Sequence, residues 1–164
     1  MIYTSYFANI DKIKAKAPWL VLVSIAGKTP DEFDGKKLKE LMPKHDWWKE
    51  WHDKYSDDET GCGIDFYKQK YYETVLNATE PEEVAAKLKE LADGKDVCLL
   101  CYEVPEKFCH RHLVAEWLQN AGIACVEWDE DGFQHNWSHD GKDLECCKKF
   151  ISSLQRIKGI TSVN

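Results

Sequence analysis

Arginine is scarce in this sequence of 164 residues. Among its 22 basic residues, only Arg111 and Arg156 are arginine, and lysine supplies the rest. Acidic residues outnumber basic ones, which leaves a net charge of −7 and a pI near 5.4. Proteins that bind long nucleic acids usually carry a basic patch or stripe. The composition therefore argues against binding of long nucleic acids, while a local basic pocket for a small anion is compatible with it.

The sequence also lacks a long hydrophobic run. Its longest apolar stretch, residues 19–26, is far shorter than the roughly 20 residues that a membrane-spanning helix needs. Residues 1–5 lack the basic and apolar regions of a secretory signal peptide. We therefore expect no membrane partner and a cytoplasmic location. The seven cysteines, an odd number, should then be reduced thiols.

Internal repeats, low-complexity tracts and obvious linkers are absent as well, so we expect one domain spanning residues 1–164. Apolar, β-branched runs predict strands at 1–5, 19–25, 97–101 and 123–128. Apolar periodicity predicts helices at 34–41, 45–55, 64–76, 79–94, 109–121 and 144–157, and polar composition predicts a loop at 129–141. Thr79 and Glu82 have the spacing of a capping box. Strands that alternate with helices indicate an α/β domain with a mostly parallel sheet flanked by helices.

The most distinctive segment joins the strand at 97–101 to the helix at 109–121. That helix opens with four chemically active residues, Cys109, His110, Arg111 and His112. Ligands of open α/β sheets bind beyond the carboxyl ends of the strands, where helix N-termini offer free N–H groups. Successive helical residues are rotated by about 100°. His110 should therefore point toward the sheet, Cys109 and Arg111 toward the edges of the apolar face, and His112 toward solvent.

Each of these residues has a functional and a structural interpretation. Cys109 is either a nucleophile with a lowered pKa or an inert, partly buried thiol. His110 is either a general base or a core histidine bonded to a backbone carbonyl. Arg111 either binds an anion through its planar guanidinium or pairs with Glu103 or Glu106. The enzyme hypothesis takes Cys109, His110 and Glu103 as catalytic residues, with Glu103 orienting the base.

Cys98 and Cys101 have the Cys-x-x-Cys spacing that occurs in zinc sites and redox motifs. Together with Cys109, His110 or His112 they offer enough thiolates and imidazoles for zinc. The pair lies within a predicted strand, however, where residues three apart face opposite sides and are separated by about 10 Å. A redox pair of this kind would need its first cysteine at a helix N-terminus. We therefore predict no metal and no cofactor.

Aromatic residues gather in the middle of the chain. Three interpretations of this group are open: a stacking wall for a planar base, a surface for a partner protein, and part of the core. The group consists of Trp47, Trp48, Trp51, Tyr67, Tyr71 and Tyr72.

The leading functional hypothesis is a protein that binds a small phosphorylated or nucleotide-like ligand, as a sensor or by sequestering it. The predicted ligand-binding residues lie at or beyond the ends of strands and are Ser5, Tyr6, Gly27, Lys28, Tyr102 and Arg111. The first alternative is an enzyme that acts on a nucleotide or a nucleic-acid component. The second is a protein-interaction module that uses the tryptophan-rich helix. A homo-oligomer is compatible with all three.

Several segments resemble a family known as domain of unknown function 488. They are Met1–Ala8, Ile25–Pro30 and, most specifically, Leu99–Glu103 with Phe108–Leu118. The resemblance spans about residues 1–128 and leaves 129–164 as a loop and helix extension. It implies a compact Rossmann-like, three-layer domain of bacterial or phage origin, without a settled activity. Many members end the second strand with an Asp-Val-Arg-like segment; residues 23–28 lack that arginine, so its role would fall to Lys28.

Overall fold

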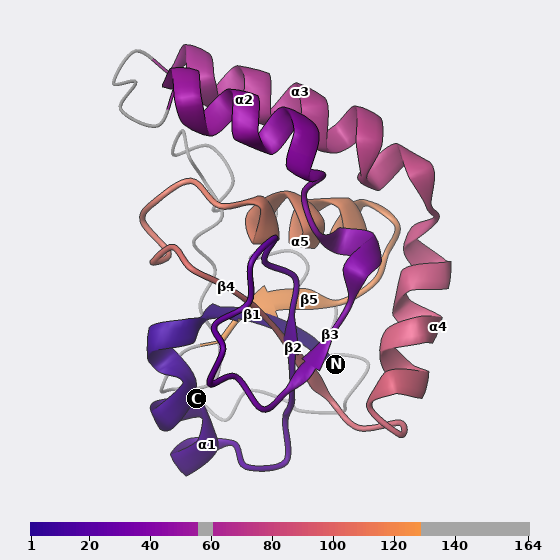
Figure 1. Cartoon of the computed structure of the whole chain (residues 1–164). Coiled ribbons are helices and arrows are strands. Elements are labelled where there is room, and N and C mark those ends of the chain that lie inside the picture. Colours follow the sequence, from indigo (N-terminus) through magenta and orange to yellow (C-terminus); the bar gives the residue numbers. More distant parts are fainter. Residues whose placement is uncertain (56–60, 129–164) are drawn as a thin grey trace, which may run out of the picture.

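The computed structural model describes residues 1–55 and 61–128. Within them, five parallel strands form one sheet in the order β3-β2-β4-β1-β5 (Figure 1). The strands are β1 Ile2–Tyr6, β2 Val21–Ser24, β3 Lys36–Lys37, β4 Val97–Cys101 and β5 Cys125–Glu127. The predicted α/β class with a parallel sheet is confirmed. The predictions of a loop at 129–141 and a helix at 144–157 lie outside the described residues.

Helices cover both faces of this sheet. They are α1 Ile10–Lys16, α2 His45–Tyr55, α3 Cys62–Thr74, α4 Pro81–Leu91 and α5 His110–Asn120. Helix α1 packs on one face, and α4 and α5 pack on the other, with α2 and α3 lying side by side beyond α5 (Figure 1). The predicted three-layer arrangement is therefore confirmed. None of the helices in residues 1–55 and 61–128 is long and apolar enough to cross a membrane.

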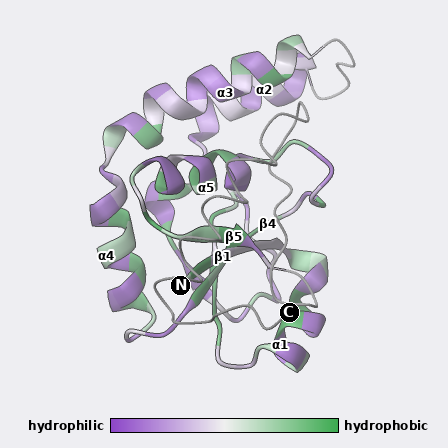
Figure 2. Ribbon diagram, turned by 180° about the vertical axis from the view of Figure 1, so that it is seen from behind, coloured by the Kyte–Doolittle hydropathy of each residue, from purple (hydrophilic) through white to green (hydrophobic). Residues whose placement is uncertain are grey.

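Strand β4 explains why the core divides into two parts. All five of its residues are buried, and their side chains alternate between the two faces of the sheet. Val97 and Leu99 join the larger core formed with α2 to α5, whereas Cys98 and Leu100 join the smaller core under α1. A strand covered on both faces reads as a continuous apolar run, as this one does. Figure 2 shows the hydrophobic strands enclosed by helices whose outer faces are hydrophilic.

Two predictions about local structure are wrong. Residues 34–41 do not form a helix: Lys36–Lys37 is a short edge strand, and a single 3-10 turn follows at Lys39–Leu41. Exposed lysines are common on edge strands, because their charge discourages further pairing. The capping box is also absent, since Glu80 is the N-cap of α4 without a side-chain hydrogen bond. Pro81 is the first residue of that helix, a position whose N–H has no hydrogen-bond partner within the helix, so the missing N–H of proline costs nothing there.

Helix α1 was not predicted from the sequence. It has only seven residues, and Ile13 is its one buried residue. The signal for an amphipathic helix comes from repeated apolar positions, and a helix with one buried residue provides too little of it.

Candidate functional site

The site lies where the carboxyl ends of three strands meet the N-terminus of α5. In the sheet register, Tyr6 of β1 pairs with Cys101 of β4, and Ser24 of β2 pairs with Leu100 of β4. Cys109 is the extended N-cap residue of α5. Its side chain is buried in a small cluster with Ala26 and Cys101, and Phe7 packs against the outside of that cluster. The topology thus brings Cys109 to the edge of the sheet where the sequence predicted a site.

Two thiols and an imidazole come together at this point. The sulfur atoms of Cys101 and Cys109 and a ring nitrogen of His110 all lie within 4.8 Å of one another. The Cys101 sulfur lies 3.8 Å from both Nδ1 and Nε2 of His110. The N–H bond or lone pair of each ring nitrogen points away from the ring in a different direction. An atom at the same distance from both nitrogens therefore cannot lie in line with either of them. Cys101 therefore contacts the imidazole without a strong hydrogen bond, and its main polar neighbour is Cys109.

The imidazole of His110 is held in one tautomer. Its Nε2 lies 2.9 Å from the carbonyl oxygen of Ile25, and its Nδ1 lies 3.1 Å from the hydroxyl of Tyr67. A carbonyl can only accept, so Nε2 carries the hydrogen and Nδ1 accepts from the Tyr67 hydroxyl. Burial lowers the pKa of His110 below its usual value. The lowered pKa favours the neutral ring, and both of its nitrogens already take part in hydrogen bonds, so the role of His110 as a general base stays a prediction.

The environment of Cys109 favours its thiolate. Burial alone would raise the pKa of the thiol, but the hydrogen bond with Cys101, the electrostatic interactions with His110 and Arg111, and the main-chain N–H of Arg111 lower it well below its usual range. The N-terminus of a helix adds a positive dipole that acts in the same direction. This arrangement stabilises negative charge on the Cys109 sulfur although the side chain is only 4% exposed.

The neighbouring thiol behaves in the opposite way. The hydrogen bond with Cys109 and burial raise the pKa of Cys101 well above its usual value. The two pKa values move in opposite directions, which favours the proton on Cys101 and the negative charge on Cys109. The pair therefore combines a thiol, Cys101, that favours its protonated form with a neighbouring sulfur, Cys109, whose negative charge is favoured.

Arg111 occupies a position different from the expected one at the edge of the helix. Its side chain is fully buried, and its Nη2 and Nε lie 3.0 and 3.3 Å from the two carboxylate oxygens of Glu127. Its Nη1 also donates to the main-chain oxygen of Glu103, and its guanidinium lies 6.0 Å from the ring centre of Tyr6. Thr4 donates a hydrogen bond of 2.5 Å to the same carboxylate. The carboxylate partner of Arg111 is thus Glu127, neither Glu103 nor Glu106.

The predicted exposure of His112 is wrong. Its side chain is 3% exposed, and its Nε2 lies 4.0 Å from a carboxylate oxygen of Glu127. The first six residues of α5 are all buried. This happens because α5 lies between the sheet and α3, so it is covered on two sides and has no fully polar face near its start. The prediction assumed that only one face of this helix is buried, so it could not identify a helix that is buried on two sides.

The remaining predicted ligand-binding residues do not all converge on this site. Ser5 projects to the opposite face of the sheet, where its Oγ accepts a hydrogen bond from Asn9. Gly27 and Lys28 lie exposed in the loop after β2. Tyr102 is 49% exposed. Of the predicted set, Tyr6, Lys28 and Tyr102 follow or end strands at the edge that carries Cys109, so their role in ligand binding stays a prediction.

Two residues that contact the site, Glu127 and Tyr67, were not identified from the sequence. Glu127 lies in the apolar run Cys125–Trp128, and a carboxylate within a buried strand requires a cationic partner. That rule would have pointed from Glu127 toward Arg111, the only arginine in the described residues. Tyr67 carried no comparable signal, because a tyrosine in an aromatic stripe is equally compatible with plain core packing.

The same cluster supplies three ligands of the two types that structural zinc sites use most, thiolate and imidazole. Cys101, Cys109 and His110 would leave a fourth position for water or substrate, as in catalytic zinc sites. Binding through either nitrogen of His110 would break its hydrogen bond to Ile25 or Tyr67. The residues present therefore fit a metal only at the expense of contacts already made, and the prediction of a metal-free site stays a prediction.

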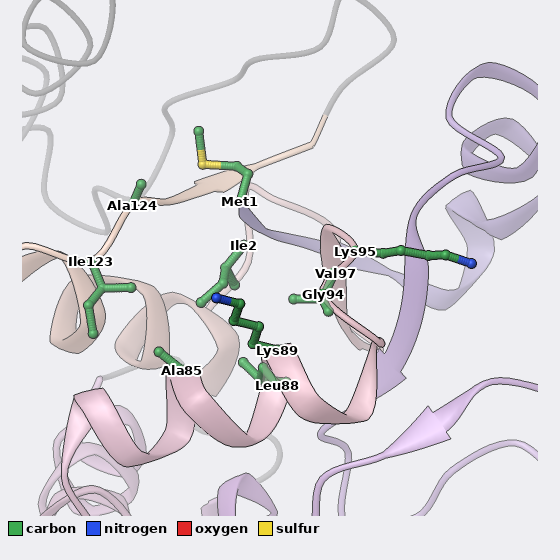
Figure 3. A pocket seen from close by; sticks show the side chains of 10 residues that line it. All are labelled: Met1, Ile2, Ala85, Leu88, Lys89, Gly94, Lys95, Val97, Ile123 and Ala124. Atoms are coloured by element: carbon green, nitrogen blue, oxygen red, sulfur yellow. The ribbon is translucent and has the colours of Figure 1, made fainter. Parts of the chain in front are cut away.

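A pocket of about 320 Å³ lies at the other end of the strands. It is lined by Ile2, Leu88, Val97 and Ile123, with Lys89 and Lys95 at its sides (Figure 3). Ile2 and Val97 are the first residues of β1 and β4, whereas Tyr6 and Cys101 are the last. The pocket is therefore separated from the Cys109 cluster by the length of the sheet.

Comparison with known proteins bears on the segment that carries this cluster. A family model described as the active DUF488-N3 subclade, DUF488-N3a, matches residues 22–122. No curated protein and no solved structure matches the chain significantly. The matched range contains Cys101, Cys109 and Arg111, while Tyr6 and Glu127 lie outside it. The chain belongs to the family known as domain of unknown function 488, as a member of its DUF488-N3 subclade.

Proposed function

We propose that this protein is an enzyme whose nucleophile is the Cys109 thiolate. The observation that carries the proposal is the position of Cys109 at the N-cap of α5, beside a donor thiol and the buried charge of Arg111. These are the features that activate cysteine nucleophiles in general. The word active in the description of the matched subclade agrees with a chemical role.

The site residues divide the work in this proposal. The Cys109 sulfur attacks an electrophilic atom of a small substrate. Cys101 donates a hydrogen bond to that sulfur and holds a proton for the leaving group. His110 keeps the Cys101 side of the cluster packed through its bonds to Ile25 and Tyr67, and Glu103 contributes its main-chain oxygen to hold Arg111. The substrate approaches from the carboxyl ends of β1, β2 and β4.

Selective alkylation tests this proposal. Iodoacetamide is added to the native protein at neutral pH, and the modified cysteines are followed over time by peptide mass spectrometry. We expect Cys109 to react faster than Cys98 and Cys125, whose thiols have a pKa raised by burial. The Cys109→Ser variant should lose the fast phase. Equal rates at all three positions would remove the basis for a nucleophilic Cys109.

A second candidate is a binding protein for a small phosphorylated or nucleotide-like ligand, acting as a sensor or by sequestration. The exposed ring of Tyr102 and the exposed cation of Lys28 favour it, because they offer stacking and charge at the same edge of the sheet. Partial burial is the main cause of the raised pKa of Tyr102, and the nearby Cys101, Glu32 and Asp31 add to it. An anion would be repelled there, and for this reason we rank binding alone second. Titration with nucleotides, compared with the Lys28→Ala variant, tests it.

A further inference from the structure

We propose that Cys101 and Cys109 form a two-thiol redox centre that reduces small disulfides, with Cys109 as the attacking thiol and Cys101 as the resolving thiol. This inference rests on the proposed nucleophilic role of Cys109 and extends it by naming a second reacting residue and a substrate class. It also differs from the Cys98–Cys101 motif that the sequence offers, since Cys98 takes no part.

The arrangement of the cysteines in the sheet selects this pair. Cys98 and Cys101 lie three residues apart on β4, so their side chains project to opposite faces and the sheet separates them. Cys101 ends the strand and projects toward α5, where its sulfur lies within 4.8 Å of the Cys109 sulfur. Seven residues connect the two, so one loop brings both sulfurs to the same small cluster.

The chemistry of the pair balances without a cofactor. The Cys109 thiolate attacks one sulfur of a disulfide RSSR, forming a mixed disulfide and releasing one RS⁻. The released thiolate takes the proton of Cys101, which becomes the new thiolate. Cys101 then attacks the Cys109 sulfur, forms the Cys101–Cys109 disulfide and releases the second RS⁻. Overall, one protein thiolate and one protein thiol are oxidised to a disulfide, and RSSR is reduced to one thiol and one thiolate, which takes a proton from water.

The proton on Cys101 suits this order of events. A resolving thiol that remains protonated does not compete with Cys109 for the substrate, and it acquires its charge only after a thiolate has been released next to it. The neutral imidazole of His110 cannot take that proton, because its Nδ1 accepts from Tyr67 and its Nε2 donates to Ile25. The leaving thiolate is therefore the base that the cluster leaves available.

The charges of the loop residues near Cys109 and Tyr102 suggest a suitable probe. Exposed Glu103 and Glu106 follow β4, and Asp31 and Glu32 lie near Tyr102. A small dication such as cystamine, the disulfide of cysteamine, is attracted by these carboxylates and carries no bulky group past Phe7. Cystamine is added to the reduced full-length protein, and intact mass with peptide mapping locates each product among the cysteines.

We expect wild-type protein to lose two hydrogens and yield a peptide linked through Cys101 and Cys109. Cys101→Ser and Cys101→Ala should instead retain one cysteamine group on Cys109, because the resolving step is missing. Cys109→Ser should react at this site at least about tenfold more slowly, because burial still raises the pKa of the remaining Cys101 thiol. Cys62→Ser, which changes an exposed cysteine at the start of α3, serves as the matched control and should give the same products at Cys101 and Cys109 as wild type.

The possible results separate the two proposals. A stable cysteamine group on Cys109 of the wild-type protein would overturn the role of Cys101 and leave the nucleophile in place. An absence of any reaction at Cys109 in wild type and in both Cys101 variants would overturn the nucleophile as well. Because Cys101→Ser and Cys101→Ala differ in polarity, agreement between them excludes misfolding of one variant as the cause.

Discussion

The guanidinium of Arg111, in the first turn of α5, forms a two-point ion pair with the carboxylate of Glu127, the last residue of β5. The two contacts measure 3.0 and 3.3 Å, and at most 1% of either side chain is exposed. Both charges have left water, so each depends on the other for compensation. The ion pair holds the N-terminus of α5 against the edge strand β5. It thereby also holds Cys109, the residue that precedes α5.

Removing one partner should destabilise the fold strongly. We expect Arg111→Ala to lower the free energy of unfolding by about 3–5 kcal/mol, because Glu127 is left as a buried charge without compensation. Denaturant titration followed by circular dichroism measures this change. The double variant Arg111→Met with Glu127→Gln should recover a large part of the loss, since it removes both charges.

The exposed pair Lys14–Asp34 provides the matched control for this measurement. Its side chains are 51% and 75% exposed. Lys14→Ala should change the free energy of unfolding by no more than about 1 kcal/mol. If Arg111→Ala were as mild as Lys14→Ala, the buried ion pair would not contribute to the fold.

The reactivity of Cys109 should depend on the thiol of Cys101. In wild type, we expect the rate of alkylation at Cys109 to stay high as the pH falls below the usual cysteine pKa of about 8.5. Cys101→Ala removes the donor that stabilises the thiolate, so the pKa of Cys109 should rise and the profile should move to higher pH. Alkylation rates measured across the neutral range by mass spectrometry give both profiles. Superimposable profiles would contradict the hydrogen bond between the thiols.

Protonation of His110 should cost stability at acidic pH. Burial lowers the pKa of His110 in the folded state, so the unfolded chain binds the proton more tightly. The contribution to stability is therefore present above the unfolded pKa of about 6.5 and is lost as the pH falls through the lower folded pKa. Melting temperatures of wild type and His110→Gln, compared between neutral and mildly acidic buffer, measure it.

Glutamine is the matched replacement because it can donate to Ile25 and accept from Tyr67 without titrating. The wild-type protein should lose more stability on acidification than His110→Gln does. Equal losses in the two proteins would mean that His110 does not titrate in this range.

Trp47 of α2 belongs to the core, and Trp48 and Trp51 are half-buried side chains that pack against it. Trp47 is buried, with its Nε1 donating to Thr74 at 2.9 Å and its ring edge-on to Tyr67 at 5.0 Å. Trp47→Ala should therefore lower the free energy of unfolding by about 3–5 kcal/mol. Trp19, which is 60% exposed, is the control, and Trp19→Ala should leave stability nearly unchanged. A mild effect at Trp47 would revive a surface role for this helix.

The sequence by itself determined the sheet and the place of the thiol within it. The apolar runs that became β2, β4 and β5 have the length and β-branched content of strands covered on both faces, which have no polar side. The strand at 97–101 and the helix after it put Cys109 at the carboxyl edge of the sheet, whatever the partners there. Local periodicity suffices for such conclusions, since it reports how each segment is covered.

The tertiary structure alone decided which side chains meet. Arg111 and Glu127 are 16 residues apart, and His110 and Tyr67 are 43 apart. These contacts exist because β5 lies next to β1 and because α3 covers α5, and no local pattern specifies either arrangement. Periodicity reports that a face is buried without naming what buries it. For that reason the sequence located the cysteine, and only the packing of distant elements decided how its neighbours His110 and Arg111 are held, through Tyr67 and Glu127.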